Sequence, residues 1–167
     1  RSDVNGQEHL YIETQGAYAR NKEDGSIVVS SSTQGPTAVQ RTVSRVLGIA
    51  MHKIEIDTVR LGGGFGGKED QATPWAVMVA LATQILHKPV KMSMHRMDDM
   101  RMTGKRHPYS ADFKIGLSKD LKILAYEVTH YQNAGAAADL SPAVMERTLF
   151  HSTGSYFIPN VIATAYS

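Results

Sequence analysis

The sequence feature that most constrains the fold is a run of five glycines and one phenylalanine from Gly62 to Gly67. The run follows residues 53–60, whose alternating pattern predicts a strand, and precedes residues 69–86, whose apolar pattern predicts a helix. Glycine has no Cβ atom, so such a loop can adopt positive φ and approach a ligand closely. A helix that follows directly would direct free N–H groups at the loop, so the sequence predicts a site for an anion or an oxo group.

Two nucleotide-binding motifs also match this loop in part. The dinucleotide pattern G-x-G-x-x-G fits Gly62, Gly64 and Gly67, but residues 71–97 contain no Asp or Glu for the ribose. The phosphate-loop pattern fits Gly62, Gly67 and Lys68, but Glu69 stands where a hydroxyl residue is needed. A nucleotide-binding module using Gly62–Gly67 therefore remains an alternative, as does a tight structural loop.

The rest of the chain alternates between predicted strands and helices. Pro36 and Gly48 bound one helix, because proline suits a first helical turn and glycine a helix end. The mixture predicts an α+β (mixed α/β) fold, with strands at 9–19, 27–29, 53–60, 89–92, 110–116, 123–132 and 160–167, and helices at 36–47, 69–86, 96–103 and 142–150. The helix at 69–86 is expected to be buried, and Pro74 predicts either a kink or a start nearer Thr73.

Composition excludes several functional classes. The 167 residues include no cysteine, so this chain can form neither a cysteine-ligated zinc or iron–sulfur site nor a thiol nucleophile. A net charge of +2 is too small to indicate nucleic-acid binding. No apolar run approaches the roughly 18 residues of a membrane span, and the polar N-terminal residues do not form a signal peptide. Both ends look cut, which predicts a piece of a longer protein of which 1–167 is one partial domain.

Several segments resemble the molybdenum hydroxylase family. The segment Leu61–Glu69, LGGGFGGKE, resembles the signature loop of these enzymes, and is more similar to the xanthine dehydrogenase branch than to the aldehyde oxidases. Four further segments resemble the family in the same chain order, namely residues 6–14, 32–34, 103–109 and 139–151. Because several motifs recur in order along nearly the whole chain, the match is far more specific than the glycine loop alone.

The resemblance implies part of the large two-lobed molybdopterin-binding domain, with mixed sheets and packed helices. The implied cofactor is molybdenum on a molybdopterin dithiolene, not held by protein side chains. The implied reaction is attack by a molybdenum-bound hydroxide on an electron-poor carbon, with hydride transfer to a sulfido ligand. Electrons would leave through iron–sulfur clusters and FAD on other domains or chains.

Five residues match positions to which the family assigns a role. The resemblance implies that Gln34 hydrogen-bonds the oxo ligand of the metal, and that the backbone at Phe65 and Gly66 approaches the metal's ligands. It also implies that Glu69 and Arg147 are catalytic and substrate-binding, with Glu69 contacting a purine and Arg147 stabilising negative charge on the purine oxygen. Phe65 could instead be a core aromatic residue.

The resulting expectation is an oxidoreductase that converts hypoxanthine and xanthine to urate. Another N-heterocycle or an aldehyde is the alternative substrate within the class, and a non-catalytic interaction domain is a further alternative. The expected partners are the remaining segments or subunits of the enzyme and a small-molecule purine, in a dimeric cytoplasmic holoenzyme. Because the family's catalytic base would lie outside these residues, the fragment alone is expected to be inactive.

Overall fold

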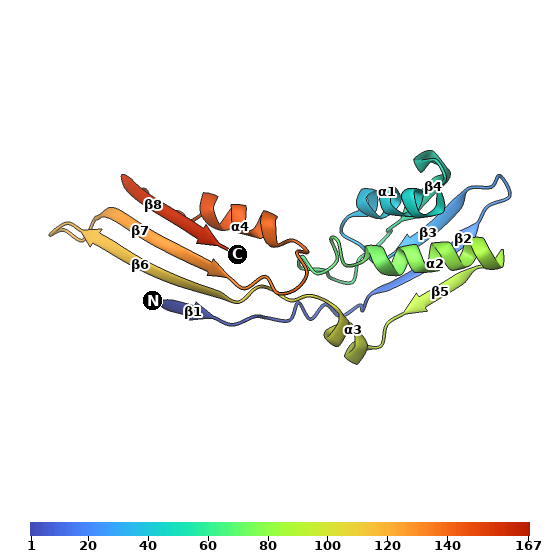
Figure 1. Cartoon of the computed structure of the whole chain (residues 1–167), viewed down its shortest axis with the longest axis horizontal. Helices are drawn as coiled ribbons and strands as arrows, with labels where there is room; N and C mark the ends of the chain where they lie inside the picture. The colour runs from blue at the N-terminus through green and yellow to red at the C-terminus, as the bar shows by residue number, and fades with distance from the viewer. The chain divides into compact units, whose positions relative to one another are not determined.

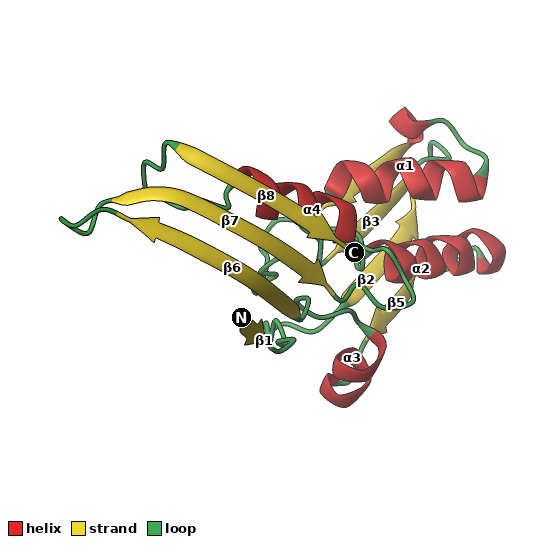
Figure 2. Cartoon of the chain, turned by 60° about the vertical axis from the view of Figure 1, so that its left-hand side comes forward, coloured by secondary structure: helices red, strands yellow, loops and turns green.

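The computed structural model describes all residues from 1 to 167. The chain forms two compact units, one from Glu8 to Gly104 and one that combines Arg1–Gln7 with Lys105–Ser167. Each unit has its own sheet with at least one helix packed beside it, so the predicted α+β class is confirmed (Figures 1 and 2). No helix has both the length and the apolar character needed to cross a membrane.

The Glu8–Gly104 unit is a four-stranded mixed sheet with two helices on one face. The strand order is β4 (Ile54–Asp57), β3 (Ile27–Ser31), β2 (Gly16–Asn21) and β5 (Val90–Ser93). Strand β2 is antiparallel to β3 and β5, whereas β3 and β4 are parallel. Helix α1 (Pro36–Leu47) and the 3₁₀ turn η1 (Met51–Lys53) connect the parallel pair, as a parallel connection requires a crossover. Helix α2 (Thr73–Leu86) packs beside α1, and the short helix α3 (Arg96–Met102) follows β5.

The core of this unit lies between the sheet and the helices α1 and α2. Helix α1 begins with Pro36 and ends before Gly48, which has a φ of 67° in the left-handed region, as the sequence predicts. Small and β-branched side chains from strands and helices interdigitate in one cluster, formed by Ala17, Ala19, Ile27, Val29, Val39, Val43, Ile54, Ala76, Val79 and Ala80. The opposite face of the sheet carries polar side chains such as Ser30, Asp57 and Lys91, which line an open hollow of about 630 Å³.

The second unit is also built on a four-stranded sheet. Its order is β1 (Ser2–Val4), β6 (Tyr109–Leu117), β7 (Ile123–Gln132) and β8 (Asn160–Tyr166), with β7 and β8 parallel and the other pairs antiparallel. Helix α4 (Ser141–Phe150) packs next to β8. Val128 is fully buried, but Phe113, Ile115 and Ile162 remain exposed, so this unit encloses little apolar core of its own.

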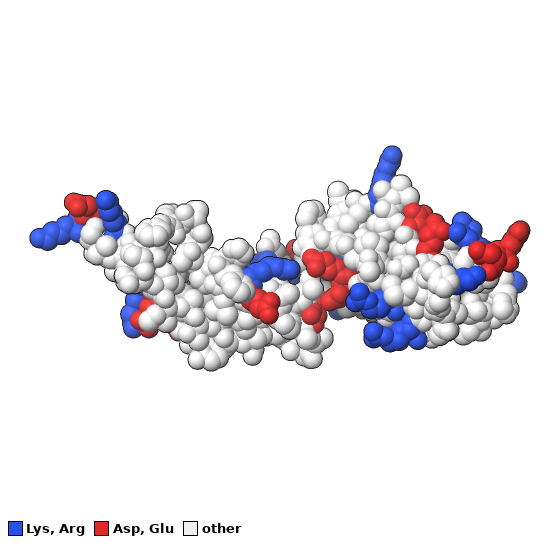
Figure 3. Space-filling view, turned by 90° about the horizontal axis from the view of Figure 1, so that it is seen from above, with Lys and Arg blue, Asp and Glu red and all other residues white.

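Charged side chains of both signs lie next to one another on the surface. Figure 3 shows acidic and basic residues mixed on the visible face, in keeping with a net charge of +2 over the sequence. Several of them form exposed pairs, such as Lys22 with Glu55 and Lys114 with Glu127. Exposed pairs of this kind add little to stability, so burial in the core is the larger contribution to folding.

Three expected elements differ from the structure. The strand expected at 9–19 is wrong over its first half, because β2 begins only at Gly16. The helix expected from Glu69 begins instead at Thr73, in agreement with the later start that Pro74 suggested. The expectation that this helix is buried is only partly confirmed, because Met78, Leu81 and Ile85 are exposed whereas Trp75 and Val79 are buried. The strand expected at 53–60 is shorter, and β1 was not expected.

The core of the Glu8–Gly104 unit provides a stability test with a matched control. Ile54 is 2% exposed and Ile12 is 94% exposed. We expect Ile54→Ala to destabilise this unit by about 2–5 kcal/mol, because it leaves a cavity under α1. Ile12→Ala should change stability by less than about 0.5 kcal/mol. Hydrogen exchange of amides in β2 to β4, measured in the full-length protein, reports both effects, and equal protection in the two variants would contradict the assignment of the core.

Candidate active-site loop

The glycine-rich segment forms a series of tight turns between β4 and α2. The Gly67 N–H donates to the Gly64 carbonyl at 2.8 Å, and both Phe65 and Gly66 have positive φ, at 55° and 90°. A Cβ atom on Gly64 would collide with the Gln34 side chain, so a larger residue here would displace Gln34 from its position against the loop. Helix α2 begins six residues after Gly67, so the expectation that a helix N-terminus follows the loop directly is wrong.

Gln34 binds the loop through its backbone and its side chain. Its backbone N–H donates to the Lys68 carbonyl at 2.8 Å, and its Oε1 accepts from the N–H groups of Gly66 at 3.0 Å and Lys68 at 3.2 Å. Thr33 adds a hydrogen bond from its hydroxyl to the same Lys68 carbonyl. The structure thus brings together Gln34, Phe65 and Gly66, three of the residues that the sequence analysis selected.

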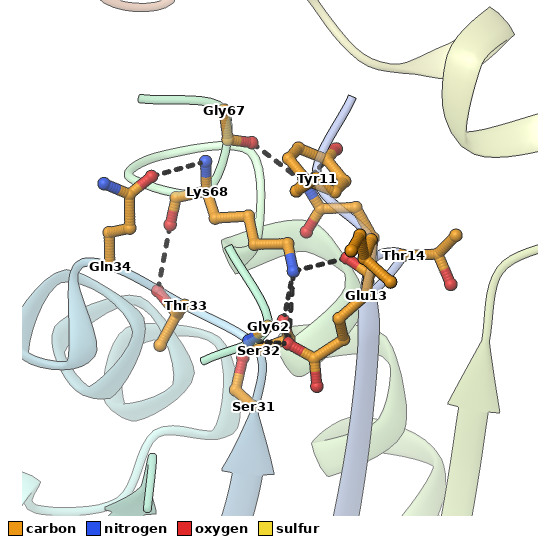
Figure 4. Close-up of polar contacts among 12 residues, drawn as sticks. Tyr11, Glu13, Thr14, Ser31, Ser32, Thr33, Gln34, Gly62, Gly67 and Lys68 are labelled. Carbon is orange, nitrogen blue, oxygen red and sulfur yellow. Dashed lines mark hydrogen bonds and ion pairs between the residues drawn. The ribbon is translucent and has the colours of Figure 1, made fainter. Parts of the chain in front are cut away.

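The orientation of Gln34 determines which donors the loop presents. Because Oε1 is turned toward the loop, the side-chain NH2 group points away from it, as Figure 4 shows, on a residue that is exposed. The Gly66 N–H is used internally by Gln34, so it is not directed at an external group. The Phe65 side chain is 74% exposed, so the interpretation of Phe65 as a core aromatic residue is wrong.

Beneath the loop, the ammonium group of Lys68 is fully buried. Its Nζ donates to the Glu13 carbonyl at 2.6 Å and the Ser32 hydroxyl at 2.6 Å, and lies 3.3 Å from Glu13 Oε2 (Figure 4). Burial lowers the pKa of Lys68, although Glu13 acts in the opposite direction. A phosphate-binding lysine would have to reach a ligand, so this arrangement argues against the phosphate-loop interpretation.

The Glu13 carboxylate completes the same network. Its Oε2 accepts from the Ser32 hydroxyl at 2.7 Å and from the Gly62 N–H at 2.8 Å. Partial burial alone would raise the pKa of Glu13, but the hydrogen bonds from Ser32 and Gly62 and the nearby Lys68 charge outweigh it, so the pKa is lowered. The first glycine of the loop is therefore tied to the segment that precedes β2.

Tyr11 and Asp99 anchor the segment that precedes β2. The Tyr11 hydroxyl donates to Asp99 Oδ1 at 2.7 Å, and the Gln15 backbone N–H donates to Asp99 Oδ2 at 2.6 Å. Burial, together with the hydrogen bond to Asp99, raises the pKa of Tyr11 to about 12. The Tyr11 ring also lies 4.5 Å from Lys68 Nζ. Residues 8–15 are irregular because their polar groups bond to α3 and the glycine loop rather than to a neighbouring strand.

The sequence analysis did not assign a role to Glu13, Tyr11 or Asp99. Each contacts residues far away in the sequence, so periodicity gives no signal for them.

Glu69 is partly buried and comes directly after the anchored Lys68, whereas Arg147 is exposed on α4 in the other unit. Their proposed pairing stays a prediction. No group of three or more His, Cys, Asp or Glu residues is placed to hold a metal ion.

The loop has the features expected for binding an anionic group with oxo ligands. The exposed side chain of Gln34 offers an amide donor. The same side chain lies so close to the backbone of Gly64 that a Cβ atom at Gly64 would collide with it. An amide donor offers N–H groups without adding negative charge, which suits an anionic partner. The residues present therefore fit a molybdopterin cofactor whose metal carries oxo ligands.

The Glu13 network predicts a pH dependence of stability. Because the pKa of Glu13 is lowered in the folded state, its stabilising effect is present above its ordinary value of 4.5 and is lost as the pH falls through the folded value. We expect Glu13→Gln to lower the urea midpoint of the full-length protein at neutral pH, with the difference from wild type shrinking as the pH falls below about 4.5. Glu23→Gln, at an exposed site, is the control. A difference that stays constant from neutral to acidic pH would exclude this role.

Comparisons with known proteins were made for the whole chain. The family of the molybdopterin cofactor-binding domain matches residues 1–167. The chain is 42% identical to nicotinate hydroxylase of Emericella nidulans over 159 residues, which is 95% of this chain and 12% of that protein. It is also 42% identical to xanthine dehydrogenase/oxidase of Felis catus over 162 residues, which is 96% of this chain and 12% of that protein. The chain thus spans about an eighth of the length of these relatives.

Solved structures show the same fold at lower sequence identity. Aldehyde oxidoreductase from Desulfovibrio gigas matches with a TM-score of 0.84 and 24% identity over 98% of this chain and 18% of that one. Quinoline 2-oxidoreductase from Pseudomonas putida 86 matches with a TM-score of 0.76 and 21% identity over 98% of this chain and 22% of that one. Together with the glycine loop and Gln34, the family match establishes that this chain belongs to the molybdopterin cofactor-binding domain family.

Proposed function

We propose that the longer protein containing this chain is an oxidoreductase that hydroxylates a nitrogen heterocycle, with hypoxanthine or xanthine as the substrate. The observation that carries this proposal is the position of Glu69, a carboxylate directly after the anchored end of a loop that presents the Gln34 amide. The 42% identity to xanthine dehydrogenase/oxidase over most of the chain supports the same reaction class. Iron–sulfur and FAD modules in other parts of the enzyme, and a dimeric cytoplasmic holoenzyme, belong to the same proposal.

Gln34, held in place by the glycine loop, would bind and orient the cofactor. When bound, the molybdenum cofactor supplies the two-electron oxidation that converts a C–H bond of the heterocycle to C–OH. The exposed NH2 group of Gln34 would donate a hydrogen bond toward the metal's oxo ligand, and its Oε1 is held by Gly66 and Lys68. Because the amide is fixed by the loop, the donor is preorganised rather than recruited on binding.

Glu69 and Arg147 would recognise the substrate. A carboxylate can accept a hydrogen bond from a ring N–H and can hold a proton as the purine changes tautomer. A guanidinium can stabilise the negative charge that develops on a purine oxygen, an effect worth several kcal/mol in a site that excludes water. A plain aldehyde would leave both groups unpaired, so a site of this kind should disfavour it.

Nicotinate is the second candidate substrate, because nicotinate hydroxylase of Emericella nidulans is as similar to this chain as the xanthine dehydrogenases. Nicotinate is an anion, which a carboxylate at Glu69 would repel and a guanidinium at Arg147 would attract, whereas a purine offers N–H donors to Glu69. A comparison of kcat/KM for nicotinate and for xanthine in the full-length enzyme separates the two candidates.

The Gln34 assignment is tested by two variants of the full-length enzyme. Gln34→Ala removes the amide, and Gln34→Glu keeps an acceptor for Gly66 and Lys68 but replaces the donor with a negative charge. Both should lower kcat by about tenfold or more, the scale of one lost oriented donor, with a smaller effect on KM. Steady-state kinetics with parallel molybdenum analysis would check this. An increase in KM alone would count against contact with the metal centre.

Substrate choice is tested by the double variant Glu69→Val with Arg147→Met in the full-length enzyme. We expect kcat/KM for xanthine to fall by about a hundredfold or more, the scale of one or two lost oriented contacts, while turnover of an aromatic aldehyde is kept or rises. The control pair Glu23→Val with Arg41→Met removes the same residue types from exposed positions. If both substrates lose turnover equally while molybdenum stays bound, the two residues serve the fold or the cofactor and not the purine.

A further inference from the structure

Lys68 is a charged side chain that the proposed chemistry does not use. It has no exposed surface, although lysine is almost never fully buried without a partner. We propose that Lys68 is a positioning residue, whose buried ammonium fixes the glycine loop so that Gln34 presents its amide in one orientation. This inference rests on the proposed role of Gln34 at the molybdenum centre, but not on the identity of the substrate.

The side chain of Lys68 connects two segments of the chain. Its Nζ donates to the Glu13 carbonyl and to the Ser32 hydroxyl, each at 2.6 Å, so the segment before β2 and the end of β3 meet at one group. The Tyr11 ring, 4.5 Å from Nζ, covers the same ammonium. These contacts come from main-chain and side-chain acceptors together, so they define the place of Nζ closely.

The backbone of the same residue orients Gln34. The Lys68 N–H donates to Gln34 Oε1 at 3.2 Å, and the Lys68 carbonyl accepts from the Gln34 N–H at 2.8 Å and from the Thr33 hydroxyl at 3.2 Å. A shift of the Lys68 backbone would therefore displace the acceptor side of the Gln34 amide and with it the exposed NH2 group. Since Ser32, Thr33 and Gln34 are consecutive, the side chain and backbone of Lys68 hold one short stretch from both ends.

Removal of the ammonium would release this arrangement. A neutral side chain leaves the Glu13 carbonyl without its short hydrogen bond and the Glu13 carboxylate without a nearby positive charge. Buried polar groups without partners are unfavourable, so the loop would move to regain hydrogen bonds. Gln34 would move with it, because Oε1 of Gln34 bonds to two N–H groups of that loop.

The test uses the full-length enzyme and compares Lys68→Met with Lys22→Met. Lys22 also pairs with a glutamate, Glu55, but its side chain is partly exposed and the pair does not touch the loop. We expect Lys68→Met to lower kcat by about tenfold or more, as small misplacements at a reacting centre do, while KM changes by less than about threefold. The electron paramagnetic resonance signal of the reduced molybdenum centre should change, and molybdenum content should be kept. Lys68→Arg, which keeps the charge, should recover part of kcat and of the signal.

Four outcomes would overturn the proposal. The first is an unchanged signal and an unchanged kcat in Lys68→Met, and the second is an equal loss of kcat in Lys22→Met. The third is no recovery of kcat or of the signal in Lys68→Arg, and the fourth is a higher KM in Lys68→Met with kcat unchanged. If Lys68→Met does not fold, Ser32→Ala decides, because it removes one of the two acceptors that lie 2.6 Å from Nζ and leaves the other in place. A milder change of the same signal in Ser32→Ala supports positioning, and an unchanged signal there overturns it. Because the signal does not require a purine, a failed purine assay with a changed signal contradicts only the substrate proposal.

Discussion

The arrangement of the glycine loop depends on one buried positive charge. An ammonium group in a site without water is strongly unfavourable unless acceptors surround it. Glu13 and Ser32 supply those acceptors from two separate segments, so satisfying Lys68 also fixes where these segments meet. The glycines of the loop have no side chains to pack. The loop therefore takes its shape from the hydrogen bonds among Lys68, Glu13 and Ser32 beneath it. The result is a glycine-rich segment whose conformation is held by charge and hydrogen bonds.

Much of the fold could be predicted from the sequence, because many elements follow local rules. Pro36 and Gly48 mark the ends of α1, and the strands expected at 110–116 and 123–132 correspond to β6 and β7, all of which the structure confirms. The segment before β2 was predicted wrongly as strand. Its residues alternate in polarity, but Tyr11 and Gln15 bond to Asp99, more than eighty residues away. Such long-range contacts override local preference, and no pattern in a single sequence reveals them.

The candidate site was predictable only through the family resemblance. A glutamine just before Pro36 is unremarkable in isolation, yet the structure places its side chain against Gly66 and Lys68. For Lys68, the neighbouring residues in the sequence suggest a side chain that binds phosphate. In the structure, that side chain points into the protein instead. The direction of a side chain depends on the acceptors available in the folded chain, and here those are Glu13 and Ser32.

Most of the residues that hold the loop are buried, whereas the residues proposed to meet the cofactor or the substrate are at least partly exposed. Lys68, Tyr11 and Asp99 are buried and hydrogen-bonded to residues of other segments. Phe65 and Arg147 are exposed, and Glu69 is partly so, and exposed positions tolerate substitution at little cost in stability. The chain is equally similar to a nicotinate hydroxylase and to a xanthine dehydrogenase/oxidase. Under the proposed function, the groups that would meet the substrate can therefore change without altering the network that holds the Gln34 amide.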